Sequence, residues 1–419
     1  MNKFLEIMER RLVPVATTIG QQRHLVAIRD AFVASMPLMI LGSIGTLINT
    51  LPIQAYQDFM MRVFGEKWLA FGTGLNNGTF NILSLLTVIA LGYNLGKAYG
   101  KDSLMTSIVA VSSFFIFGGA TGLASKGLFV ALFCGIVSSE IFIKLLDNKK
   151  LVVKMPDGVP PAVGKAFDAL FPSMITLAIF GIVPLISAFV GIEDIVLAFY
   201  EIIQEPFMGL SNNLGAAIII PFSIQILWFF GLHGGNVLAP FMETLNAPAI
   251  EANISALASG QAAPYIINKP FMTAFVHLGG SGATIGLIIA ILLVARHVKS
   301  LRAVSGLSAP AATFNINEPM IFGFPIVLNP ILFVPFVVGP VILCVIAYLT
   351  TLAGLVPAAT FVVPWNIPPV IGGVLATQSW AGGVLAAFNL VLSIIIYLPF
   401  VKLITMQEIA KEKAAKKLS

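Results

Sequence analysis

Thr313-Phe-Asn-Ile-Asn-Glu-Pro-Met-Ile-Phe-Gly-Phe-Pro325 opens a long apolar region of this chain, because no Asp, Glu, Lys, Arg or His occurs from Pro319 to Val401. A region of that length without charge predicts several membrane-embedded segments. A carboxylate inside a membrane costs about 2.5 to 3.5 kcal/mol on insertion scales, and such residues usually serve a function. Glu318, which borders the region, is therefore the first candidate functional residue.

The composition of the whole chain leads to the same fold class. Of its 419 residues, 58% are hydrophobic and only 10% are charged, which is far from the balance of a soluble domain. A membrane helix needs about 20 mostly apolar residues. Stretches of this kind occur at 31–50, 78–96, 104–123, 127–146, 174–190, 271–295, 331–355 and 384–403. With the interrupted segments described below, we expect an all-α, polytopic membrane protein with about ten membrane helices plus re-entrant hairpins.

Lys and Arg gather in short segments between the apolar stretches, where the positive-inside rule places them in the cytoplasm. The rule predicts cytoplasmic N- and C-termini, and it accounts for the net charge of +5 without a nucleic-acid partner. One conflict arises: if 218–230 and 271–295 both crossed the membrane fully, the basic residues within 296–302 would lie outside. One of these two stretches is therefore expected to be re-entrant or broken.

Interruptions concentrate in the second half of the chain. Phe230-Gly-Leu-His-Gly-Gly-Asn236 breaks an apolar run with three glycines, and 308–330 and 357–378 are rich in proline. Irregular backbone at membrane depth survives where it is buried in protein or lines a cavity, and paired interruptions mark the binding sites of transporters. We expect four regions: a cytoplasmic interfacial segment (1–30), a scaffold or dimerisation half (31–195), a substrate-binding transport half (196–405) and a cytoplasmic tail (406–419).

Glu318 precedes a proline, which favours the first turn of a helix and disfavours helical backbone before it, so a helix is predicted to start here. Asn317 or Asn315 is expected to cap that helix. A carboxylate at such a tip accepts strong hydrogen bonds from sugar hydroxyls, or takes a proton from a hydroxyl that becomes a nucleophile. The alternative is a structural acceptor, buried against Arg302 or a backbone amide.

A second constellation is Trp228-Phe-Phe-Gly-Leu-His-Gly-Gly-Asn236. His233 can offer one ring nitrogen to a ligand while a backbone group fixes the other. Gly231 lets a ligand approach the backbone closely, and Asn236 adds two donors and an acceptor. The group favours ligand contact, whereas a lone histidine more often packs between helices. For His277 the structural interpretation is favoured.

Tryptophan supplies the flat apolar surfaces on which sugar rings stack. Trp228 and Trp365 lie in or beside interrupted segments, and Gln378 follows as a polar arm. The alternative, an aromatic belt at the membrane interface, suits Trp68 and Trp380. The candidate substrate-binding residues are therefore Trp228, Gly231, Asn236, Asn317, Trp365 and Gln378.

Several kinds of chemistry lack their sequence patterns. There is no Walker phosphate-binding loop, no cluster of zinc ligands and no Ser-His-Asp arrangement, so no metal or cofactor is expected. Cys134 and Cys344 stand far apart inside apolar runs and are expected to be packing residues. The energy for any transport must then come from an ion gradient or from a partner.

The segment Asn315-Ile-Asn-Glu-Pro-Met-Ile-Phe-Gly-Phe-Pro-Ile-Val-Leu-Asn-Pro330 resembles the signature of the enzyme IIC permeases of the lactose/cellobiose (diacetylchitobiose) group, in the bacterial phosphoenolpyruvate-dependent sugar phosphotransferase system. Gly231-Leu-His-Gly234, Gln22-Arg-His-Leu-Val-Ala-Ile-Arg-Asp30 and Lys154-Met-Pro-Asp-Gly-Val-Pro-Pro161 are similar to further segments of that family. The resemblance implies a multi-pass protein of the bacterial cytoplasmic membrane, whose second half moves to expose a sugar to each side in turn.

The resemblance also implies roles for residues and partners. Glu318 and His233 match the family's catalytic pair at the sugar hydroxyl that becomes phosphorylated, and Trp228, Asn236 and Trp365 match its sugar contacts. The phosphoryl group would come from a phosphocysteine on a separate enzyme IIB protein, with enzyme IIA upstream. A homodimer and a disaccharide substrate of the cellobiose, diacetylchitobiose or lactose type are also implied.

Two other functions stay open on residue chemistry alone. An ion-coupled secondary sugar transporter would use Glu318 as a proton carrier, because a membrane carboxylate near a histidine suits a proton relay. A sugar sensor, which binds without transporting, is the third interpretation.

Overall fold

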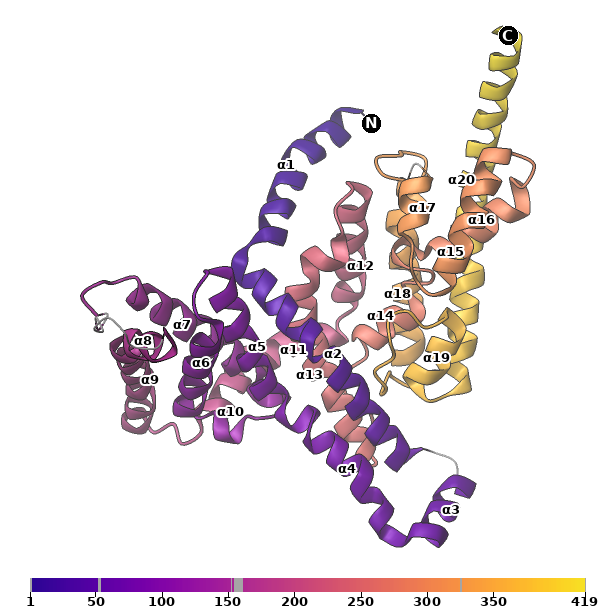
Figure 1. The fold of residues 1–419 in the computed structure, drawn as a ribbon. Coiled ribbons are helices and arrows are strands. Elements are labelled where there is room, and N and C mark those ends of the chain that lie inside the picture. Colours follow the sequence, from indigo (N-terminus) through magenta and orange to yellow (C-terminus); the bar gives the residue numbers. More distant parts are fainter. Residues whose placement is uncertain (1, 52–53, 152, 154–160, 325, 419) are drawn as a thin grey trace. The chain divides into compact units, whose positions relative to one another are not determined.

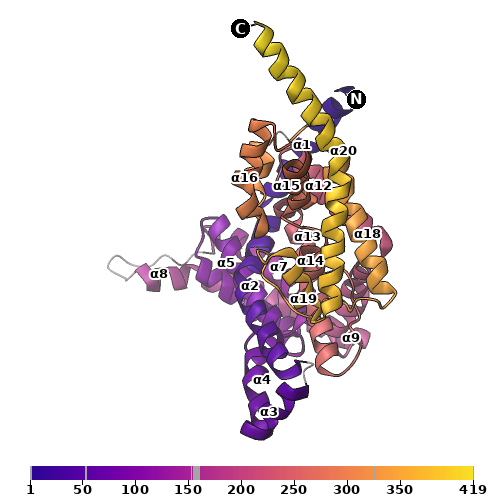
Figure 2. The ribbon, with the colours of Figure 1, turned by 90° about the vertical axis from the view of Figure 1, so that its right-hand side faces the viewer.

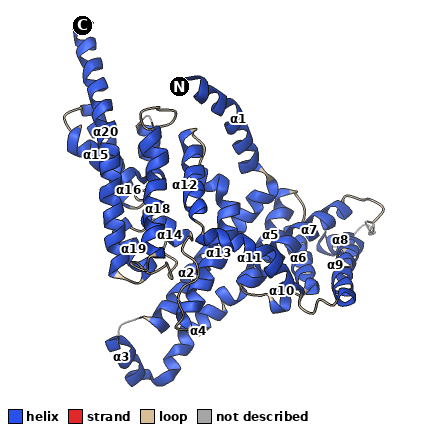
Figure 3. Cartoon of the chain, turned by 180° about the vertical axis from the view of Figure 1, so that it is seen from behind, coloured by secondary structure: helices blue, strands red, loops and turns tan. Residues whose placement is uncertain are grey.

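The computed structural model describes residues 2–51, 54–151, 153, 161–324 and 326–418. Within these residues every regular element is a helix, as Figure 3 shows in blue, and the all-α prediction is confirmed. Six helices are long and apolar enough to cross a membrane. A seventh span results if the pair Ile195–Asn212 and Leu214–Phe229, which is bent by 84°, counts as one. The described part of the chain thus has the character of a multi-pass membrane protein.

The chain forms two compact units. One consists of residues 21–209, and the other of residues 1–20 together with 210–419. The chain therefore passes between the units twice, at Gly20/Gln21 and at Gly209/Leu210. The roles that the sequence predicts for its four regions stay predictions.

The unit of residues 21–209 is a helix bundle in which α5, α6 and α7 pack against one another (Figure 1). Glycine permits this packing, because a Cβ atom on Gly96 of α5 would lie 2.7 Å from the Cα atom of Ser103 in α6. Cys134 lies in the buried core beside Phe114, and it is unpaired, as predicted. The helices of this unit are α2 (Arg23–Thr50), α3 (Gln54–Phe64), α4 (Leu69–Asn77), α5 (Leu83–Ala98), α6 (Ser103–Phe117), α7 (Leu128–Leu146), α8 (Pro161–Asp168), α9 (Leu170–Val190), α10 (Ile195–Phe199) and α11 (Glu205–Met208).

The other unit surrounds a large aromatic and aliphatic core that includes Phe229, Phe336 and Tyr397. Its last helix is long and packs against α15, α18 and α19, as Figure 2 shows for the yellow ribbon. Cys344 is buried and unpaired here, again as predicted. The helices of this unit are α1 (Asn2–Gln21), α12 (Leu214–Phe229), α13 (Gly234–Ala258), α14 (Lys269–Phe275), α15 (Thr284–Val294), α16 (Lys299–Thr313), α17 (Glu318–Gly323), α18 (Gly339–Leu352), α19 (Pro369–Thr377) and α20 (Trp380–Leu418).

One predicted span is wrong. The stretch 271–295 is not a continuous helix, since α14 ends at Phe275 and α15 begins at Thr284. Gly279, Gly280 and Gly282 between them have φ angles of 75°, 95° and 81°, a backbone region that glycine adopts without strain. The Nδ2 atom of Asn389 satisfies the carbonyl of Phe275 where α14 ends, at 2.9 Å. Both stretches in the topology conflict are therefore interrupted, because α12 also ends at Phe229.

The two proline-rich segments are only partly irregular. α16 runs through Pro310 to Thr313, so the first residues of 308–330 are helical. In 357–378 the chain is non-helical up to Pro368, after which α19 begins at Pro369. The predicted interruptions are therefore shorter than the proline content indicates, because proline is tolerated in the first turn of a helix.

Candidate functional site

Glu318 is the first residue of α17, and Pro319 follows it in the first turn, so the predicted helix start is confirmed. The Glu318 side chain is exposed. No hydrogen bond or ion pair within the described part of the chain involves its carboxylate, so the alternative of a buried acceptor bonded to Arg302 gains no support. The carboxylate is thus available to a ligand.

The predicted cap of α17 is wrong for both asparagines. Asn317 occupies the position before the helix but makes no side-chain capping bond. Its Nδ2 atom instead donates to the backbone carbonyl of Ser281, at 2.7 Å. Gly280 lies against the same side chain, because a Cβ atom there would be 2.6 Å from Cγ of Asn317. The asparagine therefore fixes the loop between α14 and α15 to the start of α17 instead of capping the helix.

Asn315 joins three irregular segments through one side-chain amide. Its Oδ1 atom accepts from the backbone N–H of Gly279 at 2.8 Å. Its Nδ2 atom donates to the backbone carbonyls of Trp365 at 2.8 Å and Ile367 at 3.0 Å. Asn315 is buried and has a φ of 59°, a left-handed conformation that asparagine tolerates better than most residues. The three-residue step from Asn315 to Glu318 thus begins at a fixed point.

Sequence reasoning missed this role of Asn315 and Asn317. The signal was present, because asparagine suits left-handed backbone and the glycines at 279, 280 and 282 indicate close backbone approach. Their pairing across 36 residues depends on tertiary contacts that a single sequence does not reveal.

His233 stands in the turn between α12 and α13. Gly231 has a φ of 81° and lets the chain reverse after α12. The Nδ1 atom of His233 accepts from the backbone N–H of Asn236 at 3.0 Å, so the histidine caps α13. An imidazole nitrogen that accepts must be unprotonated, so in the neutral ring the proton is on Nε2. The exposed ring of His233 therefore presents an N–H donor.

Trp228 lies beneath this turn. It is only 2% exposed, and its ring packs on the His233 imidazole with centroids 4.4 Å apart. In this structure it supports the histidine and offers no open stacking face. Its Nε1 atom is buried without a hydrogen-bond partner among the described residues.

The turn after α12 and the segment after α17 are neighbours. The backbone N–H of Leu328 donates to the carbonyl of Phe229 at 3.0 Å, and a Cβ atom on Gly231 would lie 3.5 Å from Val327. The polypeptide that carries Glu318 therefore returns against the polypeptide that carries His233. The structure brings together the segments of the two predicted catalytic residues.

Trp365 and Gln378 lie in the segment around α19. The Trp365 side chain is 47% exposed, so it offers an open ring face, and its backbone is held by Asn315. Gln378 ends α19 in a left-handed conformation, with its Nε2 atom 3.2 Å from Oγ1 of Thr360. No described hydrogen bond or ring contact joins either side chain to Glu318. The Asn236 side chain is exposed on the first turn of α13.

Comparison with known proteins gives consistent matches along the chain. A family model described as Phosphotransferase system, EIIC matches residues 29–340. The chain is 36% identical over 438 residues to the lichenan permease IIC component of Bacillus subtilis (strain 168), covering 98% of this chain and 96% of that protein. It is 34% identical over 439 residues to the cellobiose-specific EIIC component of Geobacillus stearothermophilus, covering 99% and 97%.

A solved structure is also similar. The transporter ChbC, the IIC component from the N,N'-diacetylchitobiose-specific phosphotransferase system, superposes with a TM-score of 0.92. The two chains are 35% identical, and the match covers 97% of this chain and 99% of that chain.

Proposed function

The chain belongs to the EIIC family of the phosphotransferase system, as a sugar permease of the cellobiose/lactose group, and we propose that it binds a disaccharide and presents it to phosphorylated enzyme IIB. The permease itself donates no phosphoryl group. It moves the sugar inward by alternating access, and the sugar leaves as its phosphate. The ion-coupled transporter is not favoured, because the family's energy source is phosphoryl transfer.

The observation that carries this proposal is the exposed carboxylate of Glu318 on an anchored helix start. A sugar hydroxyl both donates and accepts hydrogen bonds. Glu318 supplies an acceptor, and Nε2 of His233 supplies a donor. Together they orient one hydroxyl oxygen, and Glu318 takes its proton as that oxygen attacks the phosphorus atom. Positioning and charge stabilisation account for most catalysis of phosphoryl transfer.

The remaining candidate residues hold the sugar rings in this proposal. Trp365 stacks on one ring, and Asn236 and Gln378 bond ring hydroxyls. Gly231 leaves room for the sugar beside the backbone, and Trp228 supports His233 from below. Asn317 acts by fixing the α17 start, although a direct sugar contact was predicted. Cellobiose is the first sugar to test, because relatives are named for cellobiose and lichenan, followed by diacetylchitobiose and lactose.

We further propose a topology and an assembly for the permease. About ten membrane helices plus re-entrant hairpins cross the bacterial cytoplasmic membrane, with both termini in the cytoplasm. The unit of residues 21–209 forms the homodimer scaffold, and the unit that contains Glu318 moves with the sugar. Enzyme IIA phosphorylates enzyme IIB, which docks on the cytoplasmic face.

Transport by reconstituted protein tests this function. Vesicles are loaded with phosphoenolpyruvate, the general phosphotransferase proteins, enzyme IIA and enzyme IIB, and radiolabelled cellobiose, diacetylchitobiose or lactose is added outside. At least one sugar is expected to accumulate as its phosphate, and omission of enzyme IIB is expected to stop accumulation. If sugar instead accumulates unmodified and a protonophore stops uptake, the permease function proposed here is wrong.

A further inference from the structure

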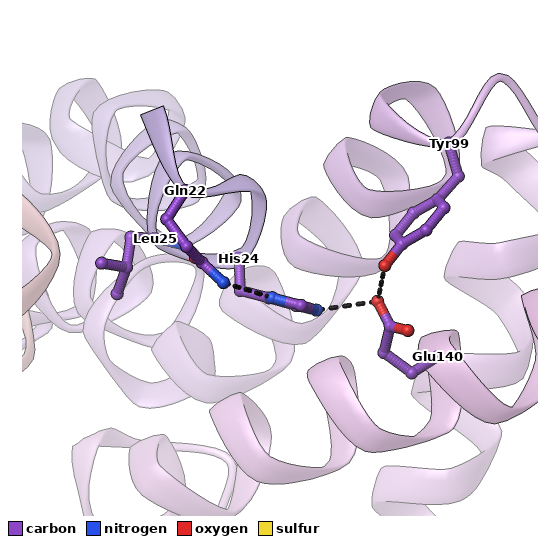
Figure 4. A network of polar contacts seen from close by, with 5 residues as sticks. All are labelled: Gln22, His24, Leu25, Tyr99 and Glu140. Atoms are coloured by element: carbon purple, nitrogen blue, oxygen red, sulfur yellow. Dashed lines mark hydrogen bonds and ion pairs between the residues drawn. The ribbon is translucent and has the colours of Figure 1, made fainter. Parts of the chain in front are cut away.

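A second polar network lies in the unit of residues 21–209, outside the candidate sugar site (Figure 4). The imidazole Nε2 atom of His24, on the first turn of α2, lies 2.7 Å from Oε1 of Glu140 on α7. The Tyr99 hydroxyl, just beyond α5, donates to the same carboxylate oxygen. On its other side, Nδ1 of His24 lies 2.7 Å from Nε2 of Gln22. The sugar chemistry uses none of these groups.

The start of α2 fixes the orientation of the Gln22 amide. The Oε1 atom of Gln22 accepts from the backbone N–H of Leu25 at 2.7 Å and thereby caps α2. The NH₂ group must then face His24, and an amide nitrogen only donates. Nδ1 of His24 is therefore the acceptor, and the ring proton is on Nε2, which donates to Glu140. The network specifies one neutral tautomer of this histidine.

A second proton on His24 is incompatible with this cap. Protonated imidazole donates from both nitrogens, so its Nδ1–H would face the NH₂ group of Gln22. If the amide turned over to accept from Nδ1–H, its NH₂ group would face the N–H of Leu25. Either way two donors oppose each other, and α2 loses its capping bond or His24 loses a partner. The gain is a charged pair with Glu140.

Charged neighbours keep both protonation states accessible. The Arg23 guanidinium lies over the Tyr99 ring, 3.9 Å from its centroid, and Lys144 on α7 also acts on Glu140. Burial, followed by the hydrogen bond to Glu140, raises the pKa of the Tyr99 phenol, so it stays a donor. The side chains of His24 and Glu140 are 29% and 19% exposed, so water reaches them. Histidine changes charge near neutral pH more readily than other side chains.

The cap lies at a crossing between the two units, because the chain leaves one unit at Gly20 and enters the other at Gln21. We propose that Gln22 and His24 form a protonation-sensitive latch at this connection. With neutral His24 the latch is closed, and α2 keeps its first turn. With protonated His24 the latch opens, the first turn of α2 frays, and the connection between the units becomes more flexible. The latch does not depend on the identity of the sugar.

Hydrogen exchange of the purified, full-length protein tests the latch without any sugar. Backbone amides of residues 24–27 are followed from pH 7.5 to 5.5, and the intrinsic pH dependence of exchange is divided out. Their protection is expected to fall by about fivefold across this range, the change expected when a side-chain cap is lost. Protection that does not change with pH would overturn the proposal.

Two variants and a control identify the groups. In Gln22→Glu the carboxylate can accept from both Leu25 N–H and protonated His24, so the pH dependence is expected to disappear with the cap retained. In His24→Asn the side chain can accept from Gln22 but does not titrate, so protection is again expected to be constant. His297→Gln, which removes an exposed histidine of the other unit, should leave the pH dependence intact. An unchanged pH dependence in either latch variant would assign the transition to other groups.

Discussion

The side-chain amide of Asn315 donates a hydrogen bond to the backbone carbonyl of Trp365 at 2.8 Å, across 50 residues of sequence. The same amide accepts from Gly279. Two irregular segments with few helical hydrogen bonds of their own are thereby fixed to the start of the motif that contains Glu318. Irregular backbone inside a membrane protein requires such partners, because lipid supplies none.

Asn315→Asp should loosen this junction, because the carboxylate keeps the acceptor for Gly279 but loses both donors. We expect the free energy of unfolding to fall by about 1 to 3 kcal/mol, since each net hydrogen bond contributes about 0.5 to 1.5 kcal/mol. Thermal unfolding in detergent measures the stability, and titration calorimetry measures sugar affinity, which should weaken as the Trp365 segment moves. Asn81→Asp, at an exposed position of the other unit, is the matched control. Equal effects of the two substitutions would contradict the assigned role.

Much of the fold was predictable from hydrophobicity alone. The apolar stretches at 31–50, 127–146 and 174–190 correspond to α2, α7 and α9. The stretch 271–295 failed because its mean composition hides Gly279, Gly280 and Gly282, whose positive φ values end the helix. Composition determines which residues enter the membrane, whereas single glycines determine where a helix stops.

The site was predictable as a set of residues but not as an arrangement. Glu318 and His233 stood out as polar groups in apolar, interrupted sequence. Their supporting bonds did not, because Asn317 was expected to cap a helix locally and instead binds Ser281. The burial of Trp228 under His233 was also hidden, since it depends on how tightly α13 turns back on α12.

His233 has two separable roles, a cap on α13 and a donor from Nε2. His233→Asn keeps a good capping residue but removes the Nε2–H group. We expect a stable protein whose phosphoryl transfer falls by about 10²-fold, the usual effect of removing one charge-stabilising donor. His233→Ala should lose stability as well as transfer. Comparison of unfolding temperatures with single-turnover rates separates the roles, and full activity of His233→Asn would exclude the donor.

Gly280→Ala places a methyl group where Asn317 already lies. Its φ of 95° strains any residue with a Cβ atom, and the added atom would be 2.6 Å from Cγ of Asn317. We expect sugar binding to be lost or the unfolding temperature to fall clearly. Gly306→Ala, in α16 with nothing within 4 Å of the added atom, is the control and should be neutral or stabilising. Similar outcomes for both would show that the α14–α15 loop does not need this close contact.

Asp102 gives the first unit a pH-dependent cap. Its carboxylate accepts from the backbone N–H of Met105 at 3.0 Å, and this bond, followed by that to Lys165, lowers the pKa of Asp102. A lowered folded-state pKa stabilises above the unfolded value and is lost as pH falls through the folded value. Stability should therefore decline as pH falls below about 4. Asp102→Asn keeps a cap without titrating, so denaturation curves of that variant should lose this component, and an unaltered acid response would assign it elsewhere.

The most direct test of the central claim compares wild-type protein with Glu318→Gln, which preserves size and hydrogen bonding but removes charge and basicity. Calorimetric cellobiose binding and transfer of phosphate from phospho-enzyme IIB to the sugar are measured on the same reconstituted sample. The account predicts weakened but detectable binding, with phosphorylation nearly abolished. Phosphorylation of the sugar at the wild-type rate by Glu318→Gln would contradict it and show that the carboxylate is structural.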